Sequence, residues 1–273
     1  MTMNKLLSFY SLVRPPFSKD IHPSEMLQMP HLQEALLALK AAVEGQTSAV
    51  MTGDSGCGKT CVWRALEEEL SQGRYRVHYL SNSAVNRRDF YRQLSAALGL
   101  EPHSSFAALY NGVSQHIQEL ASQHRLHVVI ALDEAHLLNI QVLEHLHILG
   151  NFCRDSKPWL SLVLMGLPDL REMLKRNILA SLIARIPIRI QISPLDPEQV
   201  KLYVRHRMSN AGCRRDVFSD DALLLMAKAT RGLMRRLDIL GEQCLNMALK
   251  AKSNIVDATV VQKGIQACGD ALL

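Results

Sequence analysis

The glycine-rich stretch GDSGCGKT, residues 53–60, is the part of the sequence best suited to bind a ligand. It satisfies the spacing G-x-x-x-x-G-K-[ST], follows a short apolar run and opens a helical pattern, which is the context in which this motif binds nucleotide phosphates. Glycines let backbone N–H groups curl around phosphate oxygens at a helix N-terminus. Lys59 is expected to reach the β- and γ-phosphates, and the Thr60 hydroxyl to bind Mg²⁺. The residues expected to contact ATP are Gly53, Asp54, Ser55, Gly56, Cys57, Gly58, Lys59, Thr60 and Cys61.

A pair of acids, Asp133 and Glu134, ends the apolar run HVVIAL at residues 127–132. A parallel strand beside the strand that leads into the glycine-rich loop would bring Asp133 next to the same Mg²⁺. Glu134 would then orient and activate the attacking water. Together the two motifs predict an ATPase that uses ATP and Mg²⁺.

Strand and helix patterns alternate up to about residue 193 and become purely helical after it. This alternation predicts an α/β fold with a parallel sheet covered by helices on both faces. The domains expected are residues 1–193, an N-terminal segment plus the nucleotide-binding domain, and residues 194–273, a small helical domain. The first 30 residues are expected to be extended, because Pro15 and Pro16 disfavour helix. The expected strands are 48–52, 75–80, 127–132, 160–165 and 187–192, and the expected helices are 31–44, 59–72, 87–98, 105–123, 139–153, 197–210, 219–229, 233–251 and 257–268.

The composition, 48% hydrophobic and 21% charged, is that of an ordinary globular protein and excludes disordered and fibrous classes. The formal charge of +5 is uneven: residues 171–252 hold 16 Lys and Arg against 8 Asp and Glu, so the remainder is −3. A basic back half hints at an anionic partner, although a solvated basic surface is an equal alternative. The six cysteines form no C-x-x-C pair, and no apolar run approaches the ~20 residues that span a bilayer. A cytoplasmic protein without membrane contact is expected.

The order of further motifs, from about residue 10 to residue 270, resembles the AAA+ ATPases of the ExeA/TniB/TnsC kind. ExeA acts in the assembly of secretion machinery, whereas TniB and TnsC are regulators of transposition. The resemblance implies a P-loop AAA+ sheet flanked by helices, with the C-terminal helices as a lid. The matching segments are RPPF at 14–17, DEAHLL at 133–138, LEHLHILGNF at 143–152, LVLMGLPDL at 162–170, ARI at 184–186, SPL at 193–195, YVRHR at 203–207, AG at 211–212 and RGLMRRL at 231–237.

The resemblance also implies roles for arginines outside the two motifs. Arg235 matches the sensor-2 arginine, which contacts the γ-phosphate from the lid; the alternative is a solvated helix arginine. Arg185 matches the arginine finger that one subunit offers to its neighbour's ATP, where a guanidinium fits the spread charge of the transition state. Arg189 is its competitor, and a surface salt bridge is the alternative. A finger acting in trans requires a homo-oligomer, either a ring or a helical filament.

Two positions depart from the family pattern. Leu167 stands where the family has a glutamine at the end of the fourth strand, so a polar sensor-1 residue is missing there. Asn151 is a substitute candidate, with helix capping or core hydrogen bonding as equal alternatives. Met234 replaces a proline before Arg235. Slow hydrolysis is expected from the first departure.

Three functions fit an ATPase of this kind. The first is a regulator that oligomerises on duplex DNA and recruits or activates a transposase, together with a target-selection protein. The second is an ExeA-like ATPase for secretion-machinery assembly, and the third is a signalling or defence switch. Secretion members usually carry a membrane segment and a peptidoglycan-binding domain after the ATPase, which this sequence does not show, so the first function is expected.

In transposition relatives, DNA contacts come from the face that follows the second strand. Arg87 and Arg88 stand at an expected helix start, where the helix dipole disfavours cations, so a phosphate target is indicated. Arginines paired with Asp89 are the alternative. Contacts mostly to phosphates would be largely independent of DNA sequence. The residues expected to contact DNA are Asn82, Arg87, Arg88 and Arg92.

Overall fold

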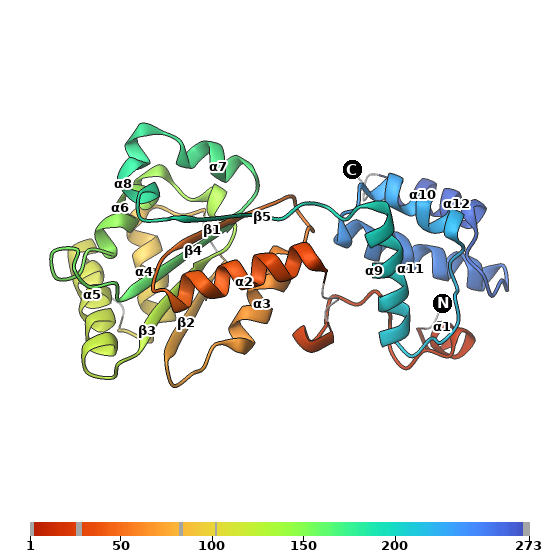
Figure 1. Ribbon diagram of the computed structural model, residues 1–273, viewed down its shortest axis with the longest axis horizontal. Helices are drawn as coiled ribbons and strands as arrows, with labels where there is room; N and C mark the ends of the chain where they lie inside the picture. Colours follow the sequence, from red (N-terminus) through yellow and green to blue (C-terminus); the bar gives the residue numbers. More distant parts are fainter. Residues whose placement is uncertain (1–2, 26–28, 82–83, 102, 270–273) are drawn as a thin grey trace. The chain divides into compact units, whose positions relative to one another are not determined.

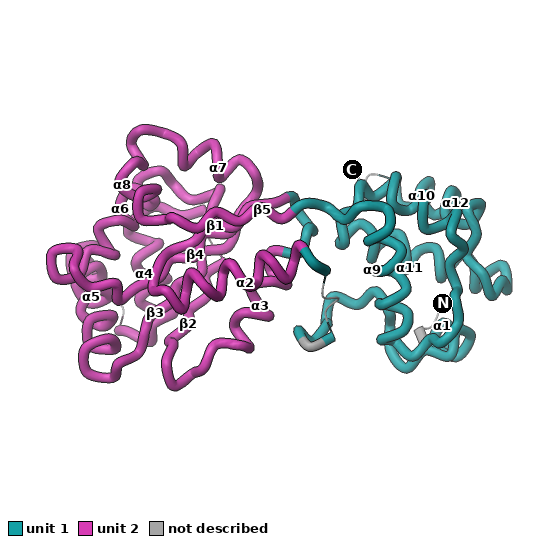
Figure 2. The backbone as a smooth tube through the Cα atoms, viewed as in Figure 1, with its two compact units in different colours: residues 1–30, 54–58, 193–273 teal, residues 31–53, 59–192 magenta. Residues whose placement is uncertain are grey.

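The chain is described by a computed structural model over residues 3–25, 29–81, 84–101 and 103–269. It forms two compact units, which Figure 2 shows in different colours. The sheet unit comprises residues 31–53 and 59–192, and the helical unit comprises residues 1–30, 54–58 and 193–273. The helical unit thus gathers the N-terminal segment and part of the glycine-rich loop with the C-terminal helices. The division into folding domains at residue 193 stays a prediction.

The sheet unit is built on five parallel strands in the order β2-β3-β4-β1-β5. The predicted parallel sheet is therefore confirmed. The prediction that the strand before Asp133 adjoins the strand before Gly53 is wrong, because β4 lies between them. Every residue of both β3 and β4 is buried, and these two most apolar strands occupy the interior of the sheet. The strands are β1 (Ala49–Thr52), β2 (Tyr75–Leu80), β3 (His127–Leu132), β4 (Leu160–Gly166) and β5 (Ile188–Gln191).

Helices cover both faces of this sheet, as the strand pattern requires. Their starts are fixed by capping side chains: Asn86 accepts from Asp89 N, and Ser105 accepts from Ala108 N. The helices are α2 (Pro30–Glu44), α3 (Lys59–Glu69), α4 (Arg87–Ala97), α5 (Phe106–Ser122), η2 (Ala135–Leu137), α6 (Ile140–Leu149), α7 (Asp169–Leu174), η3 (Asn177–Leu179) and α8 (Ala180–Ile183). Figure 1 labels the longer ones.

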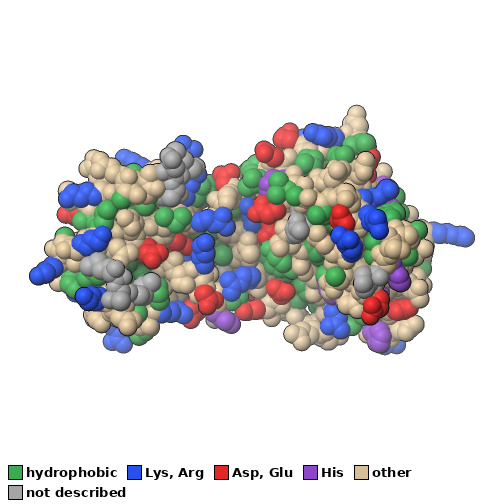
Figure 3. Space-filling view, turned by 180° about the vertical axis from the view of Figure 1, so that it is seen from behind, with side chains coloured by type: hydrophobic (Ala, Val, Ile, Leu, Met, Phe, Trp, Pro, Cys, Tyr) green, Lys and Arg blue, Asp and Glu red, His purple; other side chains and the backbone are tan. Residues whose placement is uncertain are grey.

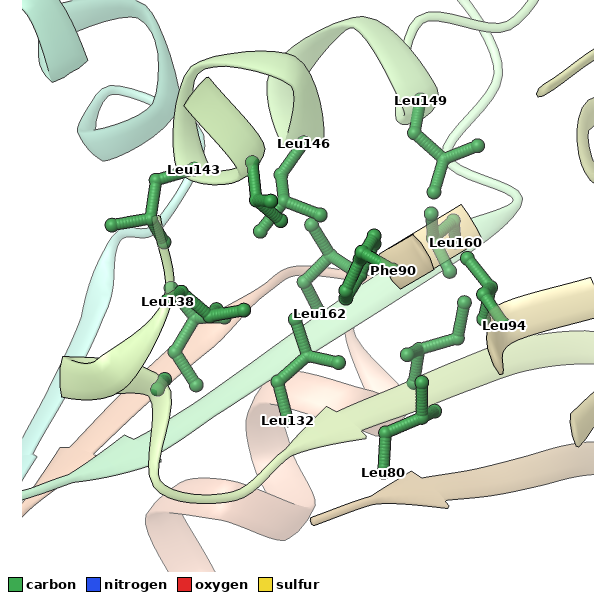
Figure 4. Packing of buried hydrophobic residues seen from close by; sticks show 14 of the residues in the cluster. Leu80, Phe90, Leu94, Leu132, Leu138, Leu143, Leu146, Leu149, Leu160 and Leu162 are labelled. Atoms are coloured by element: carbon green, nitrogen blue, oxygen red, sulfur yellow. The ribbon is translucent and has the colours of Figure 1, made fainter. Parts of the chain in front are cut away.

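One continuous apolar core lies on the sheet face that α4, α5 and α6 cover. Ile130 and Leu162 point into it from β3 and β4, whereas their strand neighbours face α2 and α3 by the alternation of side chains along a strand. Figure 4 shows leucines of α6, among them Leu143 and Leu146, above the strand residues, with Phe90 of α4 beside them. This packing fixes the strand ends, and therefore the loops that follow them.

The helical unit contains the predicted C-terminal helices together with helices at residues 3–10 and 23–25 that the sequence did not predict. Residues 3–10 were expected to be extended, but they form α1 because Leu6 and Tyr10, one turn apart, are both buried. The Tyr10 hydroxyl donates to the Ser253 carbonyl at 3.3 Å. The helices are α1 (Met3–Tyr10), η1 (Pro23–Glu25), α9 (Pro197–Asn210), α10 (Asp220–Thr230), α11 (Met234–Lys250) and α12 (Ala258–Cys268). None of the helices in the described ranges is both long and apolar enough to cross a bilayer.

A buried arginine ties the N-terminal segment to these helices. Arg207 of α9 is 5% exposed and donates to the carbonyls of Pro16 and Ser18, at 2.7 Å each. Phe17, between them, packs so closely on α11 that a Cβ at Gly241 would lie 2.6 Å from its ring. The RPPF segment is therefore an integral part of the helical unit.

Candidate nucleotide-binding site

The glycine-rich loop leaves the end of β1 and leads into α3. Gly56 and Gly58 adopt φ values of +83° and +106°, which residues with a side chain rarely tolerate. The loop also starts from a fixed point, since Gly53 N donates to the Gly166 carbonyl at 3.2 Å. A loop that curls in this way into a helix N-terminus presents its N–H groups to an anion.

Lys59 and Thr60 occupy the first turn of α3. The Lys59 side chain is buried, 8% of the residue being exposed, and its Nζ donates to the Gly53 carbonyl at 2.7 Å. The Thr60 side chain is exposed. The ammonium is therefore held within the loop, and the hydroxyl stands at its accessible side.

Asp133 follows β3 directly and is 7% exposed. Its Oδ1 accepts from Glu134 N at 2.8 Å, and its Oδ2 accepts from the Tyr79 hydroxyl at 2.5 Å. Burial, and after it the Asp133 carboxylate, raise the pKa of Tyr79 well above its usual value, so the phenol is protonated and donates throughout the ordinary pH range. Sequence reasoning missed Tyr79. Its place one residue before the end of a strand that pairs with β3 is the signal that could have found it.

Glu134 has a left-handed backbone, φ 51° and ψ 35°, which is uncommon for a residue with a side chain. Its side chain is half exposed, and its Oε2 lies 3.6 Å from Nδ1 of the largely buried His136. The same Nδ1 accepts from Leu167 N at 3.4 Å. His136 therefore connects the turn after β3 with the end of β4, where Leu167 stands.

Arg235 stands in the first turn of α11, within the helical unit. Its guanidinium donates to Ser55 Oγ at 3.1 Å, and a Cβ at Gly56 would lie 2.6 Å from the Arg235 Cβ. The sequence prediction that Arg235 acts on the nucleotide stays a prediction. The structure brings this arginine against residues 55 and 56, which belong to the same unit, and a side chain larger than glycine at position 56 has no room beside it.

Arg185 and Asn151 lie elsewhere in the sheet unit. Arg185 comes just before β5 begins, and Asn151 comes between α6 and the start of β4. Parallel strands begin at one edge of a sheet and end at the other, so both residues lie at the edge opposite to Gly53 and Asp133. Arg185 is ion-paired with Asp155 at 2.6 Å. Neither residue lies at the edge that holds Gly53 and Asp133. The ion pair of Arg185 is the surface salt bridge that stands as the alternative to a finger. The roles of Arg185 and Asn151 in hydrolysis stay predictions.

Arg189, the competing finger candidate, is exposed on β5. It lines a cavity of about 160 Å³ with apolar residues and with Arg171 and Lys175. Unlike Arg185, it belongs to a strand that is paired with β1, so its backbone has little freedom to move.

The candidate DNA-binding residues are only partly available for phosphate. The Arg87 guanidinium lies 4.4 Å above the Phe106 ring, and Arg92 is paired with Asp89 at 2.8 Å. Arg88 is exposed and has no ion pair with another described residue. Asn82 lies outside the described residues. On the face shown in Figure 3, Lys and Arg side chains are scattered among other types.

The chain is similar to known proteins in sequence and in fold. Residues 42–174 match the AAA domain family. The chain is 30% identical over 250 residues to General secretion pathway protein A of Aeromonas hydrophila. That match covers 90% of this chain but 45% of the relative, so the chain spans less than half of the relative's length.

The solved structures that resemble the chain share its fold at low identity. Cdc6p from Pyrobaculum aerophilum superposes with a TM-score of 0.75 at 19% identity, covering 93% of this chain and 70% of that one. ORC1 of Aeropyrum pernix, in complex with DNA, superposes with a TM-score of 0.65 at 19% identity, covering 92% of this chain and 68% of that one. Drosophila ORC bound to DNA superposes with a TM-score of 0.71 at 18% identity, covering 98% of this chain and 67% of that one.

Proposed function

We propose that this chain, which has the P-loop AAA+ fold and matches the AAA domain family over residues 42–174, is a Mg²⁺-dependent ATPase that works as a homo-oligomer. The observation that carries the proposal is the shared carboxyl edge of the sheet, where Lys59 and Asp133 follow β1 and β3. One strand separates β1 from β3, so their ends lie about 10 Å apart.

The residues at this edge have the chemistry that ATP and Mg²⁺ need. The loop N–H groups and the Lys59 ammonium are donors for phosphate oxygens. The Thr60 hydroxyl and the Asp133 carboxylate are oxygen ligands, which Mg²⁺ prefers. When bound, Mg²⁺ would neutralise the charge of the phosphate oxygens. Glu134 holds the water that attacks and accepts its proton.

Two arginines complete the site in this proposal. Arg235 neutralises phosphate charge from the helical unit, and its contact with Ser55 supports that role. Arg185 acts on a neighbour's ATP, and its location at the far edge of the sheet supports action in trans. Such an enzyme is inactive as a monomer and hydrolyses ATP in a ring or a helical filament.

The test is nucleotide binding and phosphate release by the wild type and by Lys59→Ala. The wild type is expected to bind a fluorescent ATP analogue and to release phosphate in the presence of Mg²⁺, whereas Lys59→Ala does neither. Lys175→Ala is the matched control, because Lys175 is an exposed lysine paired with Glu172 and should behave as the wild type. A wild-type protein that does not bind ATP would overturn the proposal.

The second part of the proposal concerns the client on which this ATPase acts. The 30% identity to General secretion pathway protein A supports a role in the assembly of secretion machinery. Duplex DNA, with a transposase recruited by the bound oligomer, is the second candidate. It is supported by the DNA-bound ORC structures, which share only the fold, and by the exposed Arg88. Sequence likeness over 250 residues outweighs likeness of fold, so we favour the first.

Retention of duplex DNA in the presence of a non-hydrolysable ATP analogue separates these candidates. If DNA is the client, the double charge reversal Arg87→Glu and Arg88→Glu abolishes ATP-dependent retention. The control is Arg176→Glu, a charge reversal at an exposed arginine elsewhere in the sheet unit. Wild-type protein that forms nucleotide-dependent oligomers but retains no DNA would exclude DNA as the client.

A further inference from the structure

The Tyr79 hydroxyl is bonded to the carboxylate that is expected to hold Mg²⁺. It donates to Asp133 Oδ2 at 2.5 Å, while the other oxygen of the same carboxylate accepts from Glu134 N at 2.8 Å. Both oxygens of Asp133 are therefore engaged by donors of fixed position. The rotation of the carboxylate about its Cβ–Cγ bond is fixed by these two contacts.

The tyrosine, which is 38% exposed on the edge strand β2, is held from two directions. Its backbone is paired with β3 in parallel register, opposite Ala131, and Asp133 N donates to the Leu80 carbonyl at 2.9 Å. Its ring stacks on Trp63, with the ring centres 6.3 Å apart and the planes 28° from parallel. Trp63 is 1% exposed and belongs to α3, one turn beyond Thr60. The hydroxyl is thus located by the same helix that carries the other expected Mg²⁺ ligand.

We propose that Tyr79 is a positioning residue that orients the Asp133 carboxylate toward Mg²⁺ and so sets the Mg²⁺ requirement of nucleotide binding. The proposal rests on the ATP and Mg²⁺ site proposed above. Partners that hydrogen-bond a metal ligand fix its orientation, and their loss typically lowers metal affinity by about 10- to 100-fold. Tyr79 touches neither ATP nor the cation in this account; it acts through Asp133.

The informative variant is Tyr79→Phe, which keeps the ring on Trp63 and removes only the hydroxyl. Binding of a fluorescent ATP analogue is titrated with Mg²⁺. The half-saturating Mg²⁺ concentration is expected to rise about tenfold or more, while binding in excess EDTA is unchanged. Tyr75→Phe is the matched control, since Tyr75 is on the same strand and its ring contacts His127 rather than Asp133. A Tyr79→Phe titration that coincides with the wild-type titration would overturn the proposal.

A double variant shows whether the hydroxyl acts through the carboxylate. In an Asp133→Asn background, Tyr79→Phe is expected to cause no further change in Mg²⁺ dependence, because the group that it orients is gone. An additive effect of the two substitutions would contradict the proposal. With Trp159→Phe in every variant, the emission maximum of the remaining Trp63 should be the same with and without the Tyr79→Phe substitution, which verifies that the stack persists. Wild-type protein that binds no ATP would instead overturn the proposed function.

Discussion

At the scale of residues, the site is defined by contacts that differ in how directly the sequence encodes them. The glycines of GDSGCGKT and the acids at 133 and 134 are recognisable from types and spacing alone. The Tyr79 contact with Asp133 is not, since it depends on which strands pair and in what register. Likewise the ion pair of Arg185 with Asp155 joins residues 30 positions apart, and no local pattern indicates it.

Leu167 is the residue at which the account predicts a gain of activity. The Leu167 N–H already bonds His136, which lies beside Glu134, so a glutamine here would carry a polar group to the edge where the γ-phosphate is expected. Leu167→Gln should raise the turnover of ATP about tenfold, because a donor aimed at developing charge lowers the barrier. Leu167→Met, which keeps the size without the amide, is the control. Equal turnover in Leu167→Gln and the wild type would count against this role.

At the scale of elements, the sequence predicts most strands and helices, because their apolar periodicity and capping residues are local. The strand order is not local. The sequences of β3 (HVVIAL) and β4 (LSLVLMG) are both apolar and do not indicate which of the two strands pairs with β1. The prediction that β3 adjoins β1 is wrong for that reason. Helix α1 is not predicted by the sequence, because the prolines at 15 and 16 favour an extended segment, whereas the burial of Leu6 and Tyr10 is a tertiary effect.

The contact of α9 with α11 predicts a pH dependence of stability. Asp238 of α11 accepts from the Tyr203 hydroxyl at 2.8 Å and lies 3.4 Å from the Arg207 guanidinium. Burial outweighs the attraction of Arg207 and raises the pKa of Asp238 to about 6, from 3.8. Because the folded state holds this proton more tightly than the unfolded state, the contribution of Asp238 to stability is complete below pH 3.8 and is lost as the pH rises through about 6.

Chemical denaturation of the wild type and Asp238→Asn between about pH 4 and about pH 7 measures this contribution. Asparagine does not ionise, so the free energy of unfolding of the wild type relative to the variant should fall by on the order of 2 kcal/mol across this range. The comparison cancels the titration of all other carboxylates. A difference that is constant with pH, or that grows as the pH rises, would contradict the assignment.

At the scale of the whole molecule, an arginine finger that acts in trans requires that subunits complete one another's sites. Arg185→Ala leaves the glycine-rich loop intact but offers its neighbour no arginine. Lys59→Ala keeps Arg185 but cannot bind ATP in its own glycine-rich loop. Each variant alone is expected to be inactive. An equal mixture should regain part of the ATPase activity, because a site of the first variant can receive Arg185 from the second.

The control for this mixing experiment is Asp155→Ala, which breaks the ion pair of Arg185 but keeps the guanidinium. It should hydrolyse ATP at close to the wild-type rate, since an exposed ion pair contributes only about 0–1 kcal/mol to stability. An Arg185→Ala protein with undiminished activity, or a mixture no more active than its parts, would contradict action in trans.

The proposed role of Glu134, activation of the water that attacks ATP, is tested most directly by comparing ATP binding and turnover in the wild type and in Glu134→Gln. The amide keeps the size of the side chain but cannot accept the proton of water. We predict that Glu134→Gln binds ATP and Mg²⁺ as the wild type does, while its steady-state phosphate release falls by about 100-fold or more. Phosphate release at the wild-type rate by Glu134→Gln would contradict the account.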